Sequence, residues 1–385
     1  MEKVNLPSKG RIYLFLPFKQ TGIMTKAILQ RIEEKVVASE RLTDEEALAL
    51  FEKAELGFLG RLASISRTKI NGNKVYFNRN FHLEPTNICI HNCLFCSYRR
   101  RVNQEGAWEM DKEAILNEID RFKDRDITEV HIVGGVHPQR DLGYYANILR
   151  SIKQKRPELH IKAFTAVELD FMIRKSKKSF KEGLLILKEA GLGSIPGGGA
   201  EIFDEELRKQ ICPDKSDSKT WLEIHQTAHE IGLSTNATIL YGHLENYHHR
   251  IDHMKRIRNL QDKTHGFQVF IPLKYKHMNN ALSAIGEVSV IEDLKNYAVS
   301  RLYLDNIPHI KAYWPMIGKD MAALSLDFGV DDLDGTIDDT TKIYSMAGAN
   351  DQNPSFSTDK LLSIIKAAGR QAIERDTLYN TIKAY

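Results

Sequence analysis

Three of the four cysteines in this 385-residue chain lie close together, in the stretch NICIHNCLFCSYRR at residues 87–100. Cys89, Cys93 and Cys96 have the spacing C-x3-C-x2-C. Thiolate sulfur binds zinc and iron–sulfur clusters, and a pair of neighbouring thiols can act as a redox dithiol. Such clustering in a large chain indicates a metal or redox site rather than a framework of disulfides.

These possible sites differ in the number of ligands that they need. A structural zinc ion normally takes four, and the fourth would have to be His91 or the distant Cys212. A redox dithiol uses two cysteines and leaves the third unexplained. A 4Fe-4S cluster held by three thiolates keeps one iron open, and an open iron binds a small chelating molecule and delivers an electron to it. Three cysteines on one loop favour this last interpretation.

The elements that must position this loop have a repeating pattern. From residue 81 onward, short apolar segments alternate with amphipathic helical segments, which is typical of a parallel sheet with helical crossovers. Eight strand candidates suit an α/β fold with a (β/α)8 TIM-type barrel, and an open doubly wound sheet is the alternative. The candidates begin at residues 81, 129, 160, 194, 234, 267, 300 and 322.

Glycine and polar residues gather where the predicted strands end. In a TIM-type barrel the C-terminal ends of the strands form the mouth that carries the functional residues. Their distribution therefore favours the barrel over the open sheet. The residues concerned are Gly134, Gly135, Glu168, Gly197, Gly198, Gly199, Asn306 and Asp327.

Four segments make up the predicted domain organisation. Residues 1–23 fit poorly with the helical pattern that starts after them and form an extension of unclear role. Residues 24–80 are expected to form an N-terminal helical cap and a short hairpin, and residues 81–349 the barrel. Residues 350–385 are expected to form a C-terminal helical segment that closes or flanks the barrel.

Two local signals lie within the N-terminal cap. Thr43 and Glu46 have the spacing of a capping box at the start of a helix. Asn71-Gly72 is a common turn of two-residue hairpins. We therefore expect a helix after Thr43 and a hairpin around Gly72.

The composition limits the partners. Lys and Arg number 54 against 51 Asp and Glu, so the formal net charge is only +3 and no broad basic surface for nucleic acid is expected. No apolar run approaches the roughly 20 residues of a membrane helix, and no export signal is apparent. We expect a small-molecule substrate, neither nucleic acid nor membrane as partner, and a cytoplasmic location where the cysteines stay reduced.

The cysteine loop resembles that of the radical S-adenosylmethionine (SAM) superfamily, which has C-x3-C-x-aromatic-C after the first strand of a barrel. The resemblance implies that Cys89, Cys93 and Cys96 bind a 4Fe-4S cluster whose open iron is chelated by SAM. It also implies that Phe95 packs near the adenine. In IVGGVHP, after the second predicted strand, Gly134 and Gly135 would let backbone groups meet the SAM amino group.

A second glycine-rich stretch, SIPGGGAE at residues 194–201, lies at another strand end. Three glycines there suggest backbone lying close to a ligand, and Gly198 is assigned to the nucleoside half of SAM. Glu201 has two interpretations. It would hold a ribose hydroxyl, or it would be a solvated residue in the first turn of a helix.

Longer stretches narrow the resemblance. HLEPTNICIHNCLFCSYRR, SIPGGGAEIF, TNATILYGHLE, RIRNLQDKTHGFQVFIPLKYKHMNN and YLDNIPHIKAYWPMIG are similar to the aminofutalosine (aminodeoxyfutalosine) synthase family of menaquinone biosynthesis. The resemblance implies that SAM is a cosubstrate. Its 5′-deoxyadenosyl radical adds to the enol ether of 3-[(1-carboxyvinyl)oxy]benzoate, and rearrangement and decarboxylation give 6-amino-6-deoxyfutalosine.

Three other functions remain open from the sequence. Cyclic dehypoxanthine futalosine synthase and FO synthase-type relatives share the cysteine loop and the GGGAE segment. A zinc-stabilised barrel that only binds a ligand is the alternative outside enzymes. An electron donor such as flavodoxin or ferredoxin is the protein partner that radical chemistry implies.

The two carboxylates of the implied substrate need cations or strong hydrogen-bond donors. His243 lies after the fifth predicted strand, with Asn236 and Thr238 on one alternating face that is expected to point into the barrel. We assign these three residues as candidate catalytic groups. Other candidates for the carboxylates are Lys274, Arg99 and Arg100, and Asn87 would orient a ligand or cap the loop backbone.

The remaining metal-ligand residue types receive structural assignments. His225 and His229 stand four apart on a predicted helix, but no glutamate of a zinc-protease motif lies between them, so no second metal is expected. Cys212 has no partner in the sequence and is expected to be a buried thiol.

Overall fold

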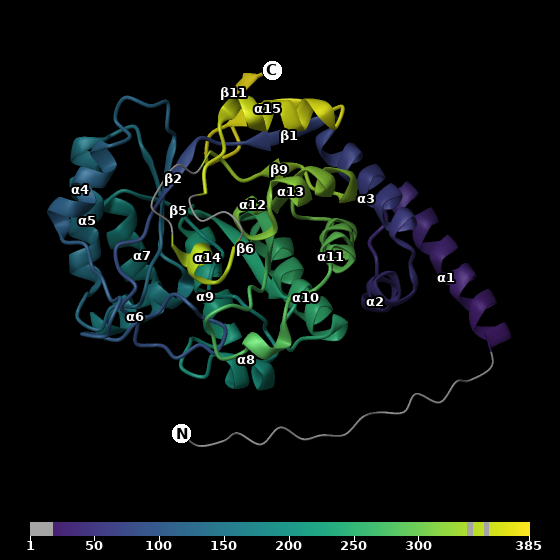
Figure 1. Ribbon diagram of the computed structural model, residues 1–385, viewed down its shortest axis with the longest axis horizontal. Helices are drawn as coiled ribbons and strands as arrows, with labels where there is room; N and C mark the ends of the chain where they lie inside the picture. The colour runs from purple at the N-terminus through teal and green to yellow at the C-terminus, as the bar shows by residue number, and fades with distance from the viewer. Residues whose placement is uncertain (1–17, 337–341, 350–353) are drawn as a thin grey trace.

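The computed structural model describes residues 18–336, 342–349 and 354–385, and side chains from residue 26 onward (Figure 1). The predicted α/β architecture is confirmed: a mostly parallel sheet of eleven strands lies inside a ring of helices. The order across the sheet is β11-β10-β1-β9-β8-β7-β6-β5-β4-β3-β2. Of the ladders between these neighbours, only the one that joins β10 to β11 is antiparallel.

The strands are short, from two residues in β9 to eight in β6 and β7. They are β1 (Lys74–Phe77), β2 (Asn80–Leu83), β3 (Glu129–Ile132), β4 (His160–Ala163), β5 (Leu192–Ile195), β6 (Ser234–Tyr241), β7 (Phe267–Lys274), β8 (His309–Ala312), β9 (Asp332–Leu333), β10 (Gln371–Arg375) and β11 (Thr381–Ala384).

The sheet is curled into a half-barrel. In a flat sheet, β2 and β8 would lie about 29 Å apart, because neighbouring strands are about 4.8 Å apart. Yet one cavity is lined by the loop after β2 and by residues in or just after each strand from β3 to β8. Curling brings these strand ends together, as the barrel prediction requires.

Helices cover the outside of the half-barrel (Figure 1). Most begin at a side-chain cap, such as Asp141, Ser179 or Asp217, which accepts a backbone N–H of the first turn. The helices are α4 (Lys112–Asp120), α5 (Leu142–Lys155), α6 (Ala166–Lys175), α7 (Phe180–Glu189), α8 (Glu205–Ile211), α9 (Ser218–Glu230), α10 (Tyr247–Thr264), α11 (Val290–Tyr303), α12 (Trp314–Ile317), α13 (Lys319–Ser325), α14 (Ile343–Met346) and α15 (Thr358–Ala367). No helix in the described part of the chain combines the length and the apolar character that spanning a membrane requires.

The N-terminal cap consists of α1 (Phe18–Ala38), α2 (Asp44–Lys53) and α3 (Leu56–Asn71), and α3 packs on α11. The predicted capping box is confirmed: the Glu46 carboxylate accepts from Thr43 N at 2.9 Å, and Glu46 N donates to the Thr43 hydroxyl at 3.3 Å. Because α1 begins at Phe18, the predicted boundary after residue 23 falls inside a helix. Residues 1–17 lie outside the described residues.

The predicted hairpin around Gly72 is wrong. Strand β1 pairs with β9 and β10, whereas β2 pairs with β3. Asn71 is the last residue of α3, and Gly72 comes next with φ +61° and donates its N–H to Thr68 O. The Asn-Gly pair therefore ends a helix. Glycine is favoured there, as it is in a hairpin turn, because it adopts a positive φ without a steric cost.

Two strand predictions are also wrong. The segment at residue 300 is the end of α11, where every residue from 296 to 303 is buried, so its continuous apolar pattern resembled a strand. The segment at residue 322 lies in α13. Strands β8 and β9 take their places in the sheet. Near the C-terminus, α15 ends at Ala367 and the rest of the predicted helix forms β10.

Candidate active site

The cysteine loop comes after β2 and folds back on itself before α4. Bridges join Thr86 to Glu109 and Ile88 to Arg100, and Cys89 N donates to Arg100 O at 3.0 Å. Asn87 fixes the return of the loop: its Oδ1 accepts from Trp108 N at 2.8 Å and its Nδ2 donates to Gly106 O at 2.9 Å. Asn87 therefore caps the loop backbone, which was one of its two predicted roles.

A single cavity of about 300 Å³ collects most of the predicted site residues. It combines three free thiols, both glycine motifs, and polar side chains from the ends of several strands. The predicted residues that line it are Cys89, Cys93, Cys96, Phe95, Gly134, Gly135, Gly198, Glu201, Asn236, Thr238 and Arg99.

Gly134 and Gly135 let the end of β3 pass under the cysteine loop. A Cβ added at Gly135 would stand 2.3 Å from Ile88 O, and one at Gly134 would stand 2.8 Å from Thr86 O. Gly135 N also donates to Thr86 O at 2.7 Å. Any larger residue would push the cysteines out of place, so these glycines set the height of the loop above the sheet.

Glu168 occupies the cavity wall behind these glycines. Its carboxylate accepts from Gly134 N at 3.2 Å and from Thr165 N at 2.7 Å, at the start of α6. Burial raises its pKa to about 7, although these hydrogen bonds act in the opposite direction. The sequence placed Glu168 at a strand end but gave it no role. Its capping-box spacing with Thr165 is the signal that marks its position.

Lys215 is a cavity residue that the sequence analysis missed. It lies in the loop between α8 and α9, where its Nζ bonds Glu201 Oε1 at 2.5 Å and sits 5.1 Å from the Phe95 ring centroid. Burial alone would lower the pKa of Lys215, but the neighbouring Cys93 and Glu201 raise it well above the ordinary value. Nothing in the local sequence QICPDKS distinguishes this lysine from a solvated one.

Glu201 is therefore neither solvated nor part of a first helical turn. It has φ +48°, and α8 begins only at Glu205. Its carboxylate points with Lys215 into the cavity that Phe95 also lines. The structure therefore contradicts the interpretation of Glu201 as a solvated first-turn residue, and its role toward a ribose hydroxyl stays a prediction.

The three thiols share one cavity but are not arranged around a point. Among the described residues, no three His, Cys, Asp or Glu side chains converge as ligands of a single metal ion. Burial raises the pKa of both the Cys89 and the Cys93 thiol, so their thiolates need a cationic partner in this site. A cuboidal cluster, in which each thiolate binds a different iron, fits this donor set.

His243 does not line the cavity. Its side chain is wholly buried, with Nε2 3.0 Å from Leu240 O and Nδ1 3.3 Å from the Glu245 carboxylate. The edge of its ring faces Tyr275, 6.4 Å between centroids, and Tyr275 lines the cavity. The structure therefore separates His243 from Asn236 and Thr238, and it places His243 directly behind a wall residue.

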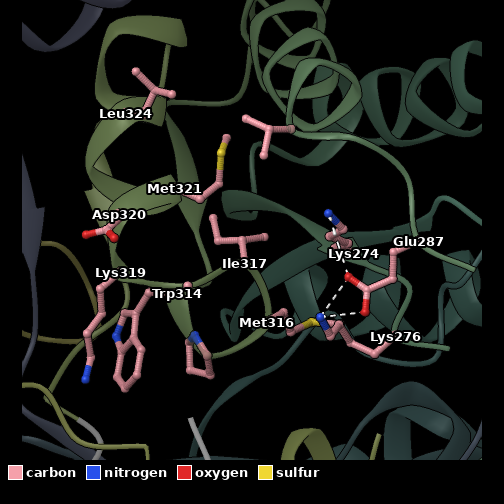
Figure 2. A pocket seen from close by; sticks show the side chains of 13 residues that line it. Lys274, Lys276, Glu287, Trp314, Met316, Ile317, Lys319, Asp320, Met321 and Leu324 are labelled. Atoms are coloured by element: carbon pink, nitrogen blue, oxygen red, sulfur yellow. Dashed lines mark hydrogen bonds and ion pairs between the residues drawn. The ribbon is translucent and has the colours of Figure 1, made fainter. Parts of the chain in front are cut away.

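Two of the other predicted cations are also occupied elsewhere. Lys274 bonds Asp293 at 2.8 Å, and Arg100 donates to the carbonyls of Ser97 and Arg99 at 3.1 and 2.8 Å. Lys274 lines a second, wider cavity of about 740 Å³ (Figure 2). Lys276 and Met316 line both cavities, and Lys276 bonds Glu287 at 2.8 Å. These two side chains therefore form the wall between the cavities.

The helical histidines serve the fold. His225 Nδ1 and His229 Nε2 both bond the Thr235 hydroxyl, at 2.9 and 2.7 Å, and His225 stacks on Trp221. Cys212 is buried with 2% exposure, in agreement with the sequence prediction.

Comparison with known families agrees with this geometry. The family model described as "Radical SAM superfamily" matches residues 83–257, and the model described as "CofH/MqnC C-terminal region" matches residues 264–384. Together they cover the cysteine loop, the half-barrel and the C-terminal strands.

Curated relatives align over nearly the whole chain. It is 42% identical to aminodeoxyfutalosine synthase of Thermus thermophilus, over 92% of this chain and 96% of the relative. It is 40% identical to the protein of that name from Streptomyces coelicolor, over 94% and 96%. Cyclic dehypoxanthine futalosine synthase of Streptomyces coelicolor is 35% identical, over 92% and 89%.

Solved structures share the fold at low identity. Methylornithine synthase superposes with a TM-score of 0.69 at 18% identity, over 88% of this chain and 95% of that one. The half-barrel, the three thiols at its mouth and the near-complete alignment with curated relatives lead to one conclusion. The chain belongs to the radical SAM superfamily.

Proposed function

We propose that this radical SAM enzyme catalyses the aminodeoxyfutalosine synthase reaction. SAM and 3-[(1-carboxyvinyl)oxy]benzoate would be converted to 6-amino-6-deoxyfutalosine and methionine, with rearrangement and loss of one carboxylate. The proposal rests on the 42% and 40% identity over more than nine-tenths of the chain, against 35% to the ring-closing relative.

The residues of the cavity mouth fit a 4Fe-4S cluster and SAM. Cys89, Cys93 and Cys96 would hold the cluster, because they are free thiols that face one cavity from one loop. With SAM bound, the cluster would supply the one-electron reduction that cleaves the sulfonium, which no amino acid side chain provides.

The chain's own residues would position SAM. The backbone at Gly134 and Gly135 lines the same cavity as the three thiols, so it would meet the amino group of SAM bound there. Phe95, Glu201 and Lys215 form a stacking and hydrogen-bonding group suited to a nucleoside. Gly198 O, which accepts from Trp221 Nε1 at 3.3 Å, is held in place beside them.

The other wall of the cavity is apolar and aromatic, and it would exclude water from the reacting centre. Its residues come from strand β7 and the residue that follows it, from the segments after β3 and β8, and from α14. They are Val133, Ile271, Leu273, Tyr275, Tyr313, Met316 and Tyr344. An aromatic acid fits this wall, and Arg99 is a lining cation, not paired with a carboxylate among the described residues, that is suited to a substrate carboxylate.

The test uses anaerobically reconstituted full-length protein, SAM, a reductant and each candidate substrate. We expect product from the enol ether benzoate with carbon from ¹⁴C-labelled adenosyl incorporated into it. Turnover only of dehypoxanthine futalosine, with label recovered in free 5′-deoxyadenosine, would support the ring-closing reaction instead. One zinc and no sulfide per chain would support the zinc-stabilised binding barrel. Omitting dithionite and adding reduced flavodoxin or ferredoxin tests the proposed electron donor.

A further inference from the structure

One of the polar residues that line the cavity has no role in the site described above. His131 lies on β3 with its side chain in the cavity wall, three residues before the glycine pair that supports the cysteine loop. Its backbone pairs with His82 of β2 and Lys162 of β4, so the three side chains form one layer across the sheet. Lys162 of this layer takes part in a buried ion pair with Glu129. His131 is the member of the layer that lines the cavity.

The neighbours of His131 are committed to other partners. Lys162 Nζ bonds Glu129 at 2.8 Å. His82 faces the Asp334 carboxylate, with 4.0 Å between Nε2 and Oδ2, and its ring meets the His131 ring edge to face at 4.9 Å. His131 makes no hydrogen bond within the described residues; its Nε2 has no accessible surface, so Nδ1 is the ring nitrogen left to face the cavity that the side chain lines.

Leaving an imidazole unpaired in the wall of an apolar cavity is costly, because a buried polar group without a partner loses its hydrogen bonds to water. An unpaired group in a cavity is therefore explained most simply by a ligand that completes its bonding. Burial, His82 and Lys162 together lower the pKa of His131 to about 3. The ring is neutral at physiological pH and carries one N–H donor and one acceptor nitrogen.

We infer that His131 is a substrate-binding residue that donates a hydrogen bond to a carboxylate oxygen of the aromatic acid bound against the apolar wall. The inference rests on the proposed function, because it takes the enol ether benzoate as the ligand. A neutral imidazole suits a positioning role. It holds the substrate through a hydrogen bond and keeps its own proton.

Position also separates His131 from the SAM side of the cavity. The groups assigned to SAM lie on the cysteine loop, at the glycine pair after β3, after β5 and in the loop after α8, whereas His131 lies within β3 itself, in the layer that it shares with His82 and Lys162. Loss of its imidazole should weaken substrate binding and leave the cluster and SAM untouched.

The test compares His131→Leu, which keeps the size but removes both nitrogens, with His131→Asn, whose amide occupies the place of Nδ1. The exposed His248→Leu is the matched surface control. For the leucine variant we expect the KM for 3-[(1-carboxyvinyl)oxy]benzoate to rise about 10- to 100-fold, because one hydrogen bond to a charged group is lost. We also expect more SAM cleaved per product formed. The asparagine variant should recover part of both losses, and His248→Leu should match the wild type.

Iron and sulfide content and the SAM-induced change in the electron paramagnetic resonance signal of the reduced cluster should be unchanged in all three variants. A wild-type KM and coupling ratio in His131→Leu would overturn the inference, and so would equal losses in the leucine and asparagine variants. If the wild type itself forms no 6-amino-6-deoxyfutalosine, the proposed function fails and the inference falls with it. If the wild type forms the product and His131→Leu has the same KM and coupling ratio, the proposed function stands and only the inference about His131 fails.

Discussion

The two ends of the half-barrel both bury polar groups, but they treat them differently. At the cavity end, the three thiols and the His131 side chain line open space, and the described residues give His131 no hydrogen bond. At the opposite end, a buried ion-pair layer fills the interior, and each charge has an opposite charge beside it. Its pairs are Lys162 with Glu129 at 2.8 Å, Lys311 with Asp334 at 2.9 Å, Arg375 with Asp332 at 2.6 Å, and Arg301 with Asp331.

The C-terminal strands complete this closed end. Arg375 belongs to β10, and the Thr377 hydroxyl donates to Glu129 at 2.6 Å, so the segment after β10 is bonded to the start of β3. Paired buried charges hold a fold together, since removing one partner leaves the other unsatisfied. Unpaired groups in a cavity are instead available to ligands. The contrast predicts that mutations at the mouth change chemistry and mutations at the closed end change stability.

The largest expected effect at the mouth is that of Cys93→Ala. Without this ligand the cluster should not assemble, and SAM cleavage and product formation should fall below detection together. Iron and sulfide analysis and product assays measure both. Cys212→Ala is the matched control, because Cys212 is equally buried but does not line the cavity, and it should retain a full cluster. Normal turnover by Cys93→Ala would refute the ligand assignment.

At the closed end, Asp331→Ala should cost stability. It leaves Arg301 buried and without its carboxylate, for which about 3–5 kcal/mol of unfolding free energy is expected. Urea unfolding of the apoprotein measures the loss. The cluster signal and the activity per folded molecule should not change. Asp262→Ala, which breaks a half-exposed pair with Arg41, should cost at most about 1 kcal/mol. A drop in activity without loss of stability would contradict the division between the two ends.

Lys215→Met tests whether a charged residue of the cavity contributes to SAM binding. It leaves Glu201 without its partner and removes the cation above Phe95. We expect the affinity for SAM to fall about 10- to 100-fold, which corresponds to the loss of a charged hydrogen bond. Equilibrium binding of labelled SAM to the reconstituted enzyme measures it. Lys209→Met, an exposed substitution on α8, serves as the control. Unchanged SAM affinity would remove Lys215 from the site.

The buried histidines around the barrel predict a dependence of stability on pH. Burial, with Arg208 and Arg256 nearby, lowers the pKa of His253 from 6.5 to about 3. Below pH 6.5 the unfolded chain binds a proton that the folded one does not. The stability is therefore fully present above pH 6.5 and falls between pH 6.5 and 3, by about 1.4 kcal/mol per pH unit for this group. We expect the free energy of unfolding to fall less between pH 7 and pH 5.5 in His253→Gln than in the wild type, as measured by denaturant unfolding at both pH values. Equal falls would contradict the assignment.

The contrast between the cavity and the ion-pair layer also explains which features could be predicted from the sequence. The cysteine spacing and the glycine pairs are local patterns with a steric or ligand-binding reason, so they were predictable. Strands β8 and β9 were missed because His309, Lys311 and Asp332 point into the ion-pair layer, and a strand with charged inner positions lacks the apolar alternation. Lys215 acquires its role from Glu201 and Phe95, which lie far from it in sequence, so no local pattern could mark it.

His243 lies between the two groups of residues. Like the ion pairs of the closed end it has bonding partners, but it lies beside Tyr275, a residue of the cavity wall. Its contacts with Leu240 O and Glu245 hold the segment after β6 against Tyr275. We expect His243→Ala to leave the cluster intact and slow product formation only a few-fold, because Tyr275 would lose support without losing its place in the wall. The informative measurement is the amount of SAM cleaved per product formed.

A purely structural histidine would lower stability and leave this ratio unchanged, whereas a loosened wall would raise the ratio in the folded enzyme. The exposed His248→Ala, five residues further along the chain, should alter neither quantity. If product yield and coupling in His243→Ala equal those of the wild type, His243 belongs with the stabilising residues of the closed end. If turnover disappears while the cluster persists, the wall depends on His243 more than its position outside the cavity implies.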